Sequence, residues 1–465
     1  MSRWLVLSRW LVLRRSLVIP TPKRHGRLMG RGFIAWGCTI CLSLGCLSLS
    51  ACSPPNAVEA ALHGDLPELK TAIQQAQKDG ELSEARVREL ARAVVRREVI
   101  STSGSAGARR IRSVRACAST VAKEAGVRAK SFDEAGAEAA LLLLSLGRYD
   151  SPQLVKKYRA VDNGAWRAVA ARAASDKAYR SFRQASYVDV DDRVRRAALA
   201  AGYESRDPAD LEAALEVTRL DPDPLARSLG ARLSGAIGGD RAVLALRDLY
   251  SRADESDRLV ILEAWSEAAA RTAGGNRELR RVAETETGMA QLVAALKLHG
   301  VVADPESDTP DGAELANILF VRALTDGTRE ERRLVLRIAP ESPELIAAAL
   351  KAAEDEDDQV KIMANARLLS DSKEAAGAKK RLTKLAMKPG DLGSQAMAAL
   401  ASVGDHSVAA SLKKRLADGP ASQRRAAAFS LVRLGEFSAA ASALADDSPR
   451  VRTAVACRLS TPEPG

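Results

Sequence analysis

The chain has 465 residues, of which 46% are hydrophobic but only 4% aromatic, and 70 Lys and Arg against 59 Asp and Glu leave a net charge of +11. Alanine and leucine dominate and β-branched runs are short, so the composition favours packed helices and excludes a strand-rich fold. A basic excess normally suggests nucleic-acid binding. Here residues 1–51 hold eight of the cations and no acid, so the rest of the chain carries only +3 (11 minus 8), which removes the main support for that function.

The N-terminal segment has the features of an export signal. A cation precedes an apolar run over residues 33–49, and the run ends in Leu49-Ser50-Ala51-Cys52. A basic region, an apolar region and small residues before a cleavage site are the marks of a secretory signal. A retained membrane anchor is the alternative, because the run is nearly long enough to span a bilayer.

This pattern resembles the signal of bacterial lipoproteins, in which a peptidase cuts before a cysteine that receives a covalent lipid. The resemblance implies that Leu49, Ser50 and Ala51 form the cleavage site and that Cys52 carries the lipid. Ser53, in place of an aspartate, is typical of lipoproteins sorted to the outer membrane. We therefore expect an outer-membrane lipoprotein that faces the periplasm, with several acyl chains, since a single short chain anchors only marginally.

The first residues contain a direct repeat, because residues 2–7 and 8–13 have the same sequence. A signal of ordinary length would begin at Met29. We therefore expect translation to start at Met29, with residues 1–28 an artefact of start-site assignment within the signal region 1–51.

Cysteine usage agrees with export, because three of the six cysteines fall within the signal. Besides Cys52, only Cys117 and Cys457 remain. In an elongated helical array these two would lie near opposite ends, whereas a disulfide needs α-carbons within about 7 Å. We therefore expect both to be unpaired, buried, small hydrophobic side chains.

Residues 52–130 are expected to form a tethered N-terminal helical cap with a basic patch. Residues 60–70 resemble the helix-turn-helix of an ankyrin unit, and a Ser/Gly-rich break is expected at residues 101–107. Residues 84–130 contain twelve Lys or Arg against four acids. This patch is a candidate contact for anionic lipid headgroups or an acidic envelope polymer, with a solvated face of two helices as the alternative. It lacks the interleaved aromatic residues that stack on nucleic acid. The residues singled out are Arg109, Arg110, Arg112 and Arg115.

Residues 131–461 repeat with a period of about 30–34 residues, which is the size of one helical hairpin and indicates a solenoid. Each unit opens on an acidic or polar turn followed by an amphipathic helix, and acids at a helix N-terminus suit both capping and the helix dipole. Further helices are expected at 138–146, 166–173, 408–416 and 439–444. The unit starts lie at Asp191, Asp221, Asp257, Asp357, Gly393, Ser422 and Asp447.

The recurring Asp-x-x-Val-Arg-x-x-Ala and Leu-Gly-Asp phrases resemble the HEAT family in its short bacterial form. The match is clearest over residues 191–260 and 355–458, whereas residues 275–354 are degenerate and include an expected acidic loop at 304–311. The resemblance implies an all-α fold, an α-solenoid of HEAT-like helical hairpins over residues 131–461 with a short tail at 462–465. Stacked hairpins of this kind bury a continuous core and present an extended surface.

No catalytic constellation is evident. After residue 51 the histidines are His63, His299 and His406, without metal-ligand spacing. Residues 370–373 and 411–414 match the SxxK pattern of penicillin-binding proteins but lack its companion motifs. The acidic run at residues 354–358 is expected to be a solvated loop whose last acids cap the next helix, with a cation site as the alternative.

These observations predict a non-catalytic scaffold or adaptor that binds another envelope protein. No metal, no small-molecule substrate, no nucleic acid and no cofactor other than the lipid on Cys52 are expected. Two alternatives remain at this point: a HEAT-like lyase or modifying enzyme, such as the bilin lyases of the short-HEAT proteins, and a cell-wall or polysaccharide binder. The fold by itself does not choose between them.

Overall fold

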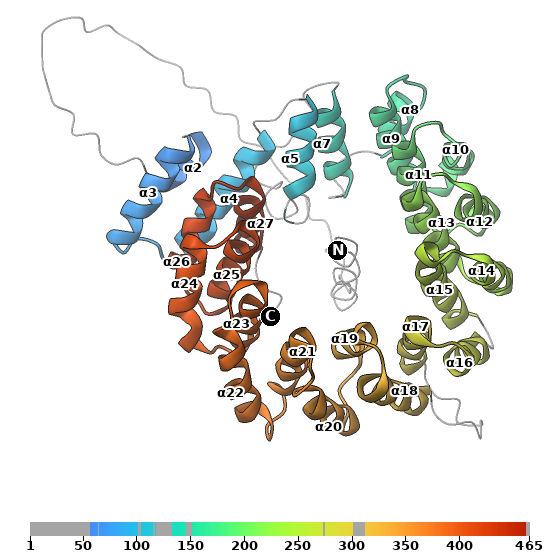
Figure 1. Cartoon of the computed structure of the whole chain (residues 1–465). Coiled ribbons are helices and arrows are strands. Elements are labelled where there is room, and N and C mark those ends of the chain that lie inside the picture. Colours follow the sequence, from blue (N-terminus) through green and yellow to red (C-terminus); the bar gives the residue numbers. More distant parts are fainter. Residues whose placement is uncertain are drawn as a thin grey trace, which may run out of the picture. The chain divides into compact units, whose positions relative to one another are not determined.

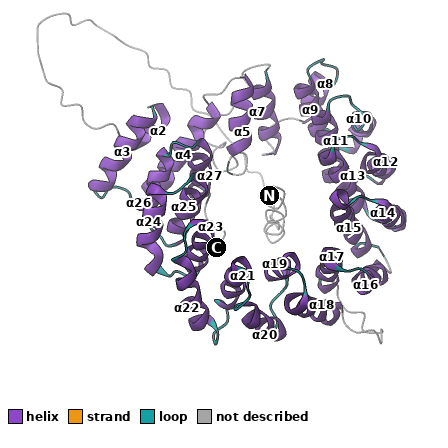
Figure 2. Ribbon diagram, in the orientation of Figure 1, coloured by secondary structure: helices purple, strands orange, loops and turns teal. Residues whose placement is uncertain are grey.

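The computed structural model describes residues 56–63, 65–100, 104–114, 117, 133–145, 151–272, 275–300 and 312–461. Throughout these ranges the secondary structure is helical, with no strand (Figure 2). None of the described helices combines the length and the apolar character that a bilayer crossing requires. The fold is all-α, as predicted. The four lipoprotein-signal residues, Arg115, the 304–311 segment and the tail lie outside the described residues.

Successive helices form hairpins that stack in two rows (Figure 1). In the first row each odd-numbered helix packs on the next odd-numbered helix, whereas the even-numbered helices of the second row pack mainly on first-row helices. The first row comprises α7 (Glu134–Ser145), α9 (Gly164–Ala173), α11 (Asp192–Ser205), α13 (Pro224–Ile237), α15 (Glu255–Ala270), α17 (Gly288–His299), α19 (Arg329–Ile338), α21 (Asp358–Leu368), α23 (Gly390–Ser402), α25 (Ala421–Arg433) and α27 (Pro449–Ser460). The second row comprises α8 (Ser151–Tyr158), α10 (Arg180–Ser186), α12 (Leu211–Leu220), α14 (Asp240–Arg252), α16 (Gly275–Thr285), α18 (Gly312–Asp326), α20 (Pro343–Ala352), α22 (Ala375–Ala386), α24 (Ala409–Asp418) and α26 (Phe437–Ala441). This is the predicted α-solenoid of HEAT-like hairpins.

Acidic turns start several of the first-row helices, as the sequence predicts, whereas others begin after an asparagine, threonine, serine or proline. Asp191, Asp223 and Asp357 are the N-caps of α11, α13 and α21. Their carboxylates accept hydrogen bonds of 2.9–3.1 Å from backbone N–H groups of the first turn. Each cap satisfies donors that have no partner within the helix. The degenerate stretch at 275–354 also forms hairpins, because α16 to α20 occupy it.

An arginine–aspartate ladder joins neighbouring units of the first row. An arginine on one helix reaches an aspartate at the start of the next first-row helix or in the turn before it, with Arg195 Nε–Asp221 Oδ2 at 2.7 Å and Arg227 Nε–Asp257 Oδ2 at 2.6 Å. The hydrogen bond to the aspartate raises the pKa of Arg195 and Arg227 above the ordinary arginine value. The ladder fixes the turn of each hairpin to its neighbour. Further rungs are Arg167–Asp189, Arg333–Asp357 and Arg424–Asp446.

The N-terminal helices are α2 (Ala57–His63), α3 (Leu66–Lys78), α4 (Glu84–Ile100) and α5 (Gly104–Val114). The first two form the predicted helix-turn-helix. The break expected at 101–107 is wrong over residues 104–107, where α5 already begins at Gly104, and residues 101–103 lie outside the described residues. Buried Ala108, Ile111 and Val114 recur at a spacing of three, which gives this stretch one apolar helix face despite its glycines.

The prediction that Cys117 and Cys457 are unpaired is wrong. The structure joins them in a disulfide, with their α-carbons 5.0 Å apart across a sequence separation of 340. The prediction failed because it placed the two cysteines at distant ends of an array. Instead, α4 and α5 pack against α27, so the N-terminal helices and the last helix share one hydrophobic core.

Candidate functional site

The candidate site is a groove between the second-row helices α12 and α14. The first-row helices beneath it, α13 and α15, approach each other closely at Gly235. A Cβ on this glycine would lie 2.5 Å from the carbonyl oxygen of Ala264. Helix α13 packs extensively on α15, whereas α12 and α14 contact each other much less. Tight first-row packing with a splayed second row therefore leaves a long open channel.

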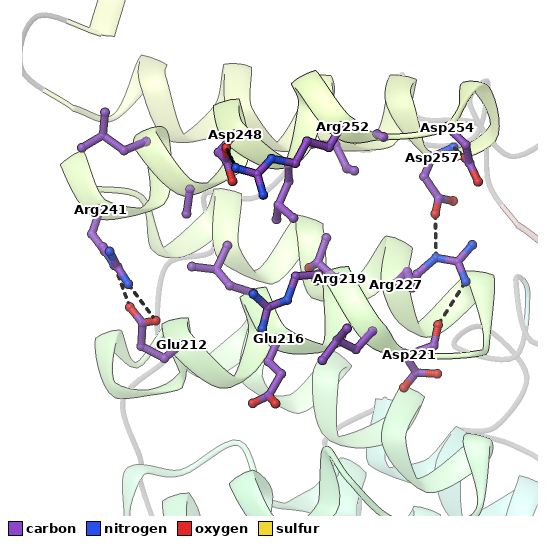
Figure 3. A pocket seen from close by; sticks show the side chains of 18 residues that line it. Glu212, Glu216, Arg219, Asp221, Arg227, Arg241, Asp248, Arg252, Asp254 and Asp257 are labelled. Carbon is purple, nitrogen blue, oxygen red and sulfur yellow. Dashed lines mark hydrogen bonds and ion pairs between the residues drawn. The ribbon is translucent and has the colours of Figure 1, made fainter.

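The groove has a volume of about 960 Å³ (Figure 3). Two leucines on its walls are unusually open to solvent, Leu220 of α12 with 62% of its surface exposed and Leu244 of α14 with 52%. Apolar side chains that protrude into a groove rather than into the core are typical of binding surfaces. The other residues that line the groove are Glu212, Leu215, Glu216, Thr218, Arg219, Asp221, Arg227, Arg241, Ala245, Asp248, Leu249, Arg252, Ala253, Asp254, Asp257 and Ile261.

Ion pairs stand at both ends of the groove. Arg241 of α14 bridges to Glu212 of α12, with Nε–Oε1 at 2.9 Å and Nη2–Oε2 at 3.1 Å (Figure 3). At the opposite end Arg227 donates to Asp257, and its Nη1 donates to the backbone oxygen of Asp221 at 3.0 Å. These contacts tie the walls together without filling the channel between them.

Two carboxyl groups of the groove have lowered pKa values. Its described lining residues include no histidine and no cysteine. The hydrogen bond from Arg241 holds the pKa of the Glu212 carboxyl below its ordinary value, and hydrogen bonds from Ser256 and from backbone N–H groups do the same for Asp254. Carboxylates with lowered pKa values stay ionised near neutral pH.

A second hollow, of about 410 Å³, lies where α3 meets the C-terminal helices. Its wall is formed by α3, α24 and the short 3-10 helix η5 (Ser442–Ala445). Most of its charged groups are already paired, with Arg424 on Asp446 at 2.7 Å and Lys413 on Glu436 at 2.8 Å. This hollow therefore belongs to the packing of the chain ends.

The predicted basic patch falls on α4 and α5. Arg109, Arg110 and Arg112 all lie exposed on α5. Two of them also face acids, with Arg110 Nε 3.7 Å from Glu98 and Arg112 Nη1 3.3 Å from Glu138. Contact of these arginines with an anionic surface stays a prediction, as does the lipidation of Cys52.

The acidic run at 354–358 caps a helix, as predicted, and its carboxylates face cations. Besides capping α21, Asp357 lies 2.7 Å from Arg333 Nη2 and 3.1 Å from Arg329 Nε, and Asp355 lies 3.0 Å from Arg332 Nε. Within the described ranges no three His, Cys, Asp or Glu side chains gather as metal ligands would. Arginines thus provide the positive charge that the alternative assigned to a metal ion.

The remaining motifs are spread over separate elements. His63 ends α2, His299 ends α17, and His406 begins the 3-10 helix η4 (His406–Val408). Of the two SxxK matches, 370–373 lies in the turn before α22 and 411–414 lies within α24. Neither the histidines nor these serines line the groove.

Sequence analysis missed the groove, although one signal for it was present. In α12 the buried positions run from Leu211 through Ala214 and Leu215 to Thr218, and Leu220 falls off that stripe. An apolar residue outside the buried stripe of an amphipathic helix indicates a second, uncovered apolar surface. The spacing between α12 and α14 has no such local signal.

A mostly buried carboxyl group, Glu263, lies on α15 and faces neighbouring first-row helices. Burial raises the pKa of Glu263. The positive charges of Arg232 on α13 and Lys297 on α17 lower this pKa by less than burial raises it, and the negative charge of Glu267 raises it further. A raised carboxyl pKa stabilises the fold below the ordinary value near 4.5, and this contribution is lost as the pH rises through the raised value.

Glu263→Gln is therefore expected to be more stable than the parent chain above neutral pH, with the difference shrinking toward pH 4. Chemical denaturation followed by circular dichroism from pH 4 to pH 9 measures it. Glu216→Gln, on an exposed position of α12, is the matched control and should show no such trend. A constant difference for Glu263→Gln across this range would contradict the assignment.

Comparisons with known proteins add little to this description. No protein-family model matches the sequence, and no curated protein does either. Among solved structures, a triple mutant of Kap121p matches with 12% identity and a TM-score of 0.31, covering 85% of this chain. Another crystal structure of Kap121p matches with 12% identity and a TM-score of 0.26, covering 86%. This chain spans 47% and 44% of the length of those two chains.

Proposed function

We propose that this chain is a non-catalytic scaffold that binds another protein of the bacterial envelope in the groove between α12 and α14. The observation that carries the proposal is the pair of exposed leucines, Leu220 and Leu244, on opposite walls of a channel about 960 Å³ in volume. Removal of such side chains from water contributes about 25 cal/mol per Å² of apolar surface. A partner segment with an apolar ridge would supply the missing cover.

The ionic ends of the groove support orientation of that segment. The Arg241–Glu212 bridge leaves both side chains largely solvated, with 70% and 67% of their side-chain surfaces exposed. Charged residues also line the middle of the groove, between the two ends, namely Glu216, Arg219, Asp248 and Arg252 (Figure 3). Polar groups at a protein–protein interface set register more than affinity. The groove offers no buried polar pocket for a small molecule among its described residues.

The envelope address is part of the proposal and rests on the sequence of the signal. Cleavage before Cys52 and its lipidation would leave the array tethered to the outer membrane on its periplasmic side. Arg109, Arg110 and Arg112 on α5, with Arg115 beyond it in sequence, would then lie within a few dozen residues of the tether. Each cation near an anionic surface contributes up to about 1 kcal/mol of attraction.

Site-specific photo-crosslinking in intact cells tests the groove. A photoreactive side chain at Leu220 or at Leu244 is expected to give the same protein adduct, because both positions line one channel. Met387 is the matched control, since it is an apolar residue with 80% of its surface exposed outside the groove. Absence of an adduct at both groove positions, or an equal adduct at Met387, would contradict binding in the groove.

The same cells test the address through Cys52→Ala. Fractionation should place the parent chain with the outer membrane and mass spectrometry should find acyl chains on Cys52. The Cys52→Ala chain should lose both the acyl chains and the processing before that position. If the parent chain is unacylated or lies in the cytoplasmic fraction, the proposed outer-membrane location is wrong. The crosslinking result for the groove does not depend on this outcome.

A further inference from the structure

The first and last helices of the described array are packed together. Helices α4 and α5 contact α27, and α3 contacts α26 and η5. Buried Leu90 and Val94 of α4 belong to the same hydrophobic core as Val455 and Leu459 of α27. We name this contact of α2–α5 with α26, η5 and α27 the terminal clasp.

Polar contacts across the terminal clasp reach mostly backbone oxygens. Gln77 Nε2 donates to the oxygen of Ser438 at 2.7 Å, and Arg88 Nη1 donates to the oxygen of Leu459 at 3.2 Å. The Arg88 guanidinium also lies 5.5 Å from the centre of the Phe437 ring. Of these donors, Arg88 caps the carbonyl end of α27, whose last carbonyl groups have no partner within the helix, and Gln77 reaches α26.

One charged group at the centre of the terminal clasp serves both sides. Glu98 of α4 is 8% exposed, and its carboxylate lies 3.8 Å from Arg452 Nη2 of α27 and 3.7 Å from Arg110 Nε of α5. Both ion pairs are longer than a direct hydrogen bond. They orient the two chain ends more than they bind them together.

The disulfide is the one covalent link across the terminal clasp among the described residues. Cys117 follows α5, and Cys457 lies in the last turns of α27, so the bond ties both partners of the contact. A bond between residues this far apart in sequence restricts the open state strongly, because the loop it closes contains most of the chain.

We propose that the terminal clasp is a redox-controlled closure. With the Cys117–Cys457 bond formed, α2–α5 are held on α27. With the bond reduced, the closure becomes a reversible equilibrium, and each opening uncovers part of the hydrophobic core that α27 shares with α4. The reduced chain thereby gains an apolar surface that the oxidised chain lacks.

The chemistry is a thiol–disulfide exchange. Closure removes two electrons and two protons from the Cys117 and Cys457 thiols and transfers them to the disulfide of an oxidant, which becomes two thiols. Opening is the reverse reaction with a dithiol, whose two sulfurs end in a disulfide of their own. The inference uses residues outside the groove and does not depend on the proposed function.

Hydrogen exchange with mass spectrometry on the full-length chain tests the proposal, with dithiothreitol as the reductant. Peptide mapping without reductant should first recover the linked Cys117 and Cys457 peptides. Reduction should then speed exchange at least tenfold in α4 and α27 and leave α11, α13 and α15 unchanged, because only the clasp loses its covalent restraint. Free thiols at both positions in the untreated chain, or unchanged exchange in α4 and α27, would overturn the proposal.

The Cys117→Ser/Cys457→Ser double variant is the matched control. It should exchange like the reduced parent chain, and dithiothreitol should cause no further change, which excludes effects through Cys52. Circular dichroism of the double variant should show the helical content of the parent chain. If this variant unfolds, the reduced parent chain supplies the decisive comparison.

Discussion

Asp210→Ala is expected to lower the free energy of unfolding of the region around α12 by about 3–5 kcal/mol, the usual cost of stranding one partner of a buried ion pair. Arg183 of α10 is completely buried, and its Nε donates to Asp210 Oδ2 at 2.7 Å. Asp210 is completely buried as well, at the end of the 3-10 helix η3 (Pro208–Asp210) that leads into α12. Without the Asp210 carboxylate the buried guanidinium keeps its charge, loses its nearer counter-ion, and is left with Asp207 at 3.6 Å.

The other contacts of Arg183 cannot compensate for this loss. Its Nη1 donates to the backbone oxygens of Ala174 at 2.7 Å and Asp176 at 3.1 Å, and Asp207 lies 3.6 Å from its Nη2. Carbonyl dipoles solvate the charge but do not neutralise it. Asp210 immediately precedes α12, which forms one wall of the groove. Loss of the Arg183–Asp210 ion pair should therefore also destabilise α12.

Hydrogen exchange in α10 and α12, together with urea denaturation, measures the effect of Asp210→Ala. Glu212→Ala is the matched control, because Glu212 lies two residues further along in an exposed ion pair with Arg241. Exposed pairs contribute little to stability. Equal stability of the two variants would contradict the assignment of Arg183 and Asp210 as a buried structural pair.

Gly235→Ala is expected to destabilise the array by about 1–3 kcal/mol, although the same change in an ordinary helix is stabilising. The new Cβ would lie 2.5 Å from the carbonyl oxygen and 2.9 Å from the α-carbon of Ala264. Backbone atoms cannot rotate out of the way, so α13 and α15 must move apart. That movement should also change the spacing of α12 and α14 above them.

Gly377→Ala is the matched control for this substitution. A Cβ at Gly377 of α22 would meet only the flexible end of the Arg381 side chain, at 3.3 Å. Relief of the glycine penalty should therefore stabilise the chain by up to about 0.5–1 kcal/mol. We expect the denaturation midpoint to fall for Gly235→Ala and to rise for Gly377→Ala. Stabilisation by both substitutions would show that α13 and α15 do not need the close contact.

Much of the array was predictable because its signals are local. Asp191, Asp223 and Asp357 lie where a helix cap requires a short acceptor, and an amphipathic helix follows the first two. These patterns repeat at the length of one hairpin, so they indicated both the helices and their stacking. Even the degenerate stretch at 275–354 folds as hairpins, because packing between neighbours compensates for a weak motif.

The groove and the terminal clasp were not predictable in the same way. In the sequence, Leu220 and Leu244 do not differ from buried helix leucines. They are exposed because α12 and α14 stand apart, although the first-row helices beneath them are in close contact at Gly235 and Ala264. The pairing of Cys117 with Cys457 depends on whether α4 meets α27. That meeting is set by the accumulated rotation of all the stacked hairpins between them, and no single repeat reveals it.

Sequence alone therefore determined the helical class, the hairpin period and the capped helix starts, since each depends on residues close together in the chain, whereas the envelope address stays a prediction. Tertiary structure decided which side chains face each other across hundreds of residues: the disulfide, the contacts of Glu98, and the channel beside Leu220 and Leu244. The physical reason is that hydrogen bonding and apolar periodicity act over a few residues. The relative positions of distant helices in a stacked array instead depend on the packing of every hairpin between them.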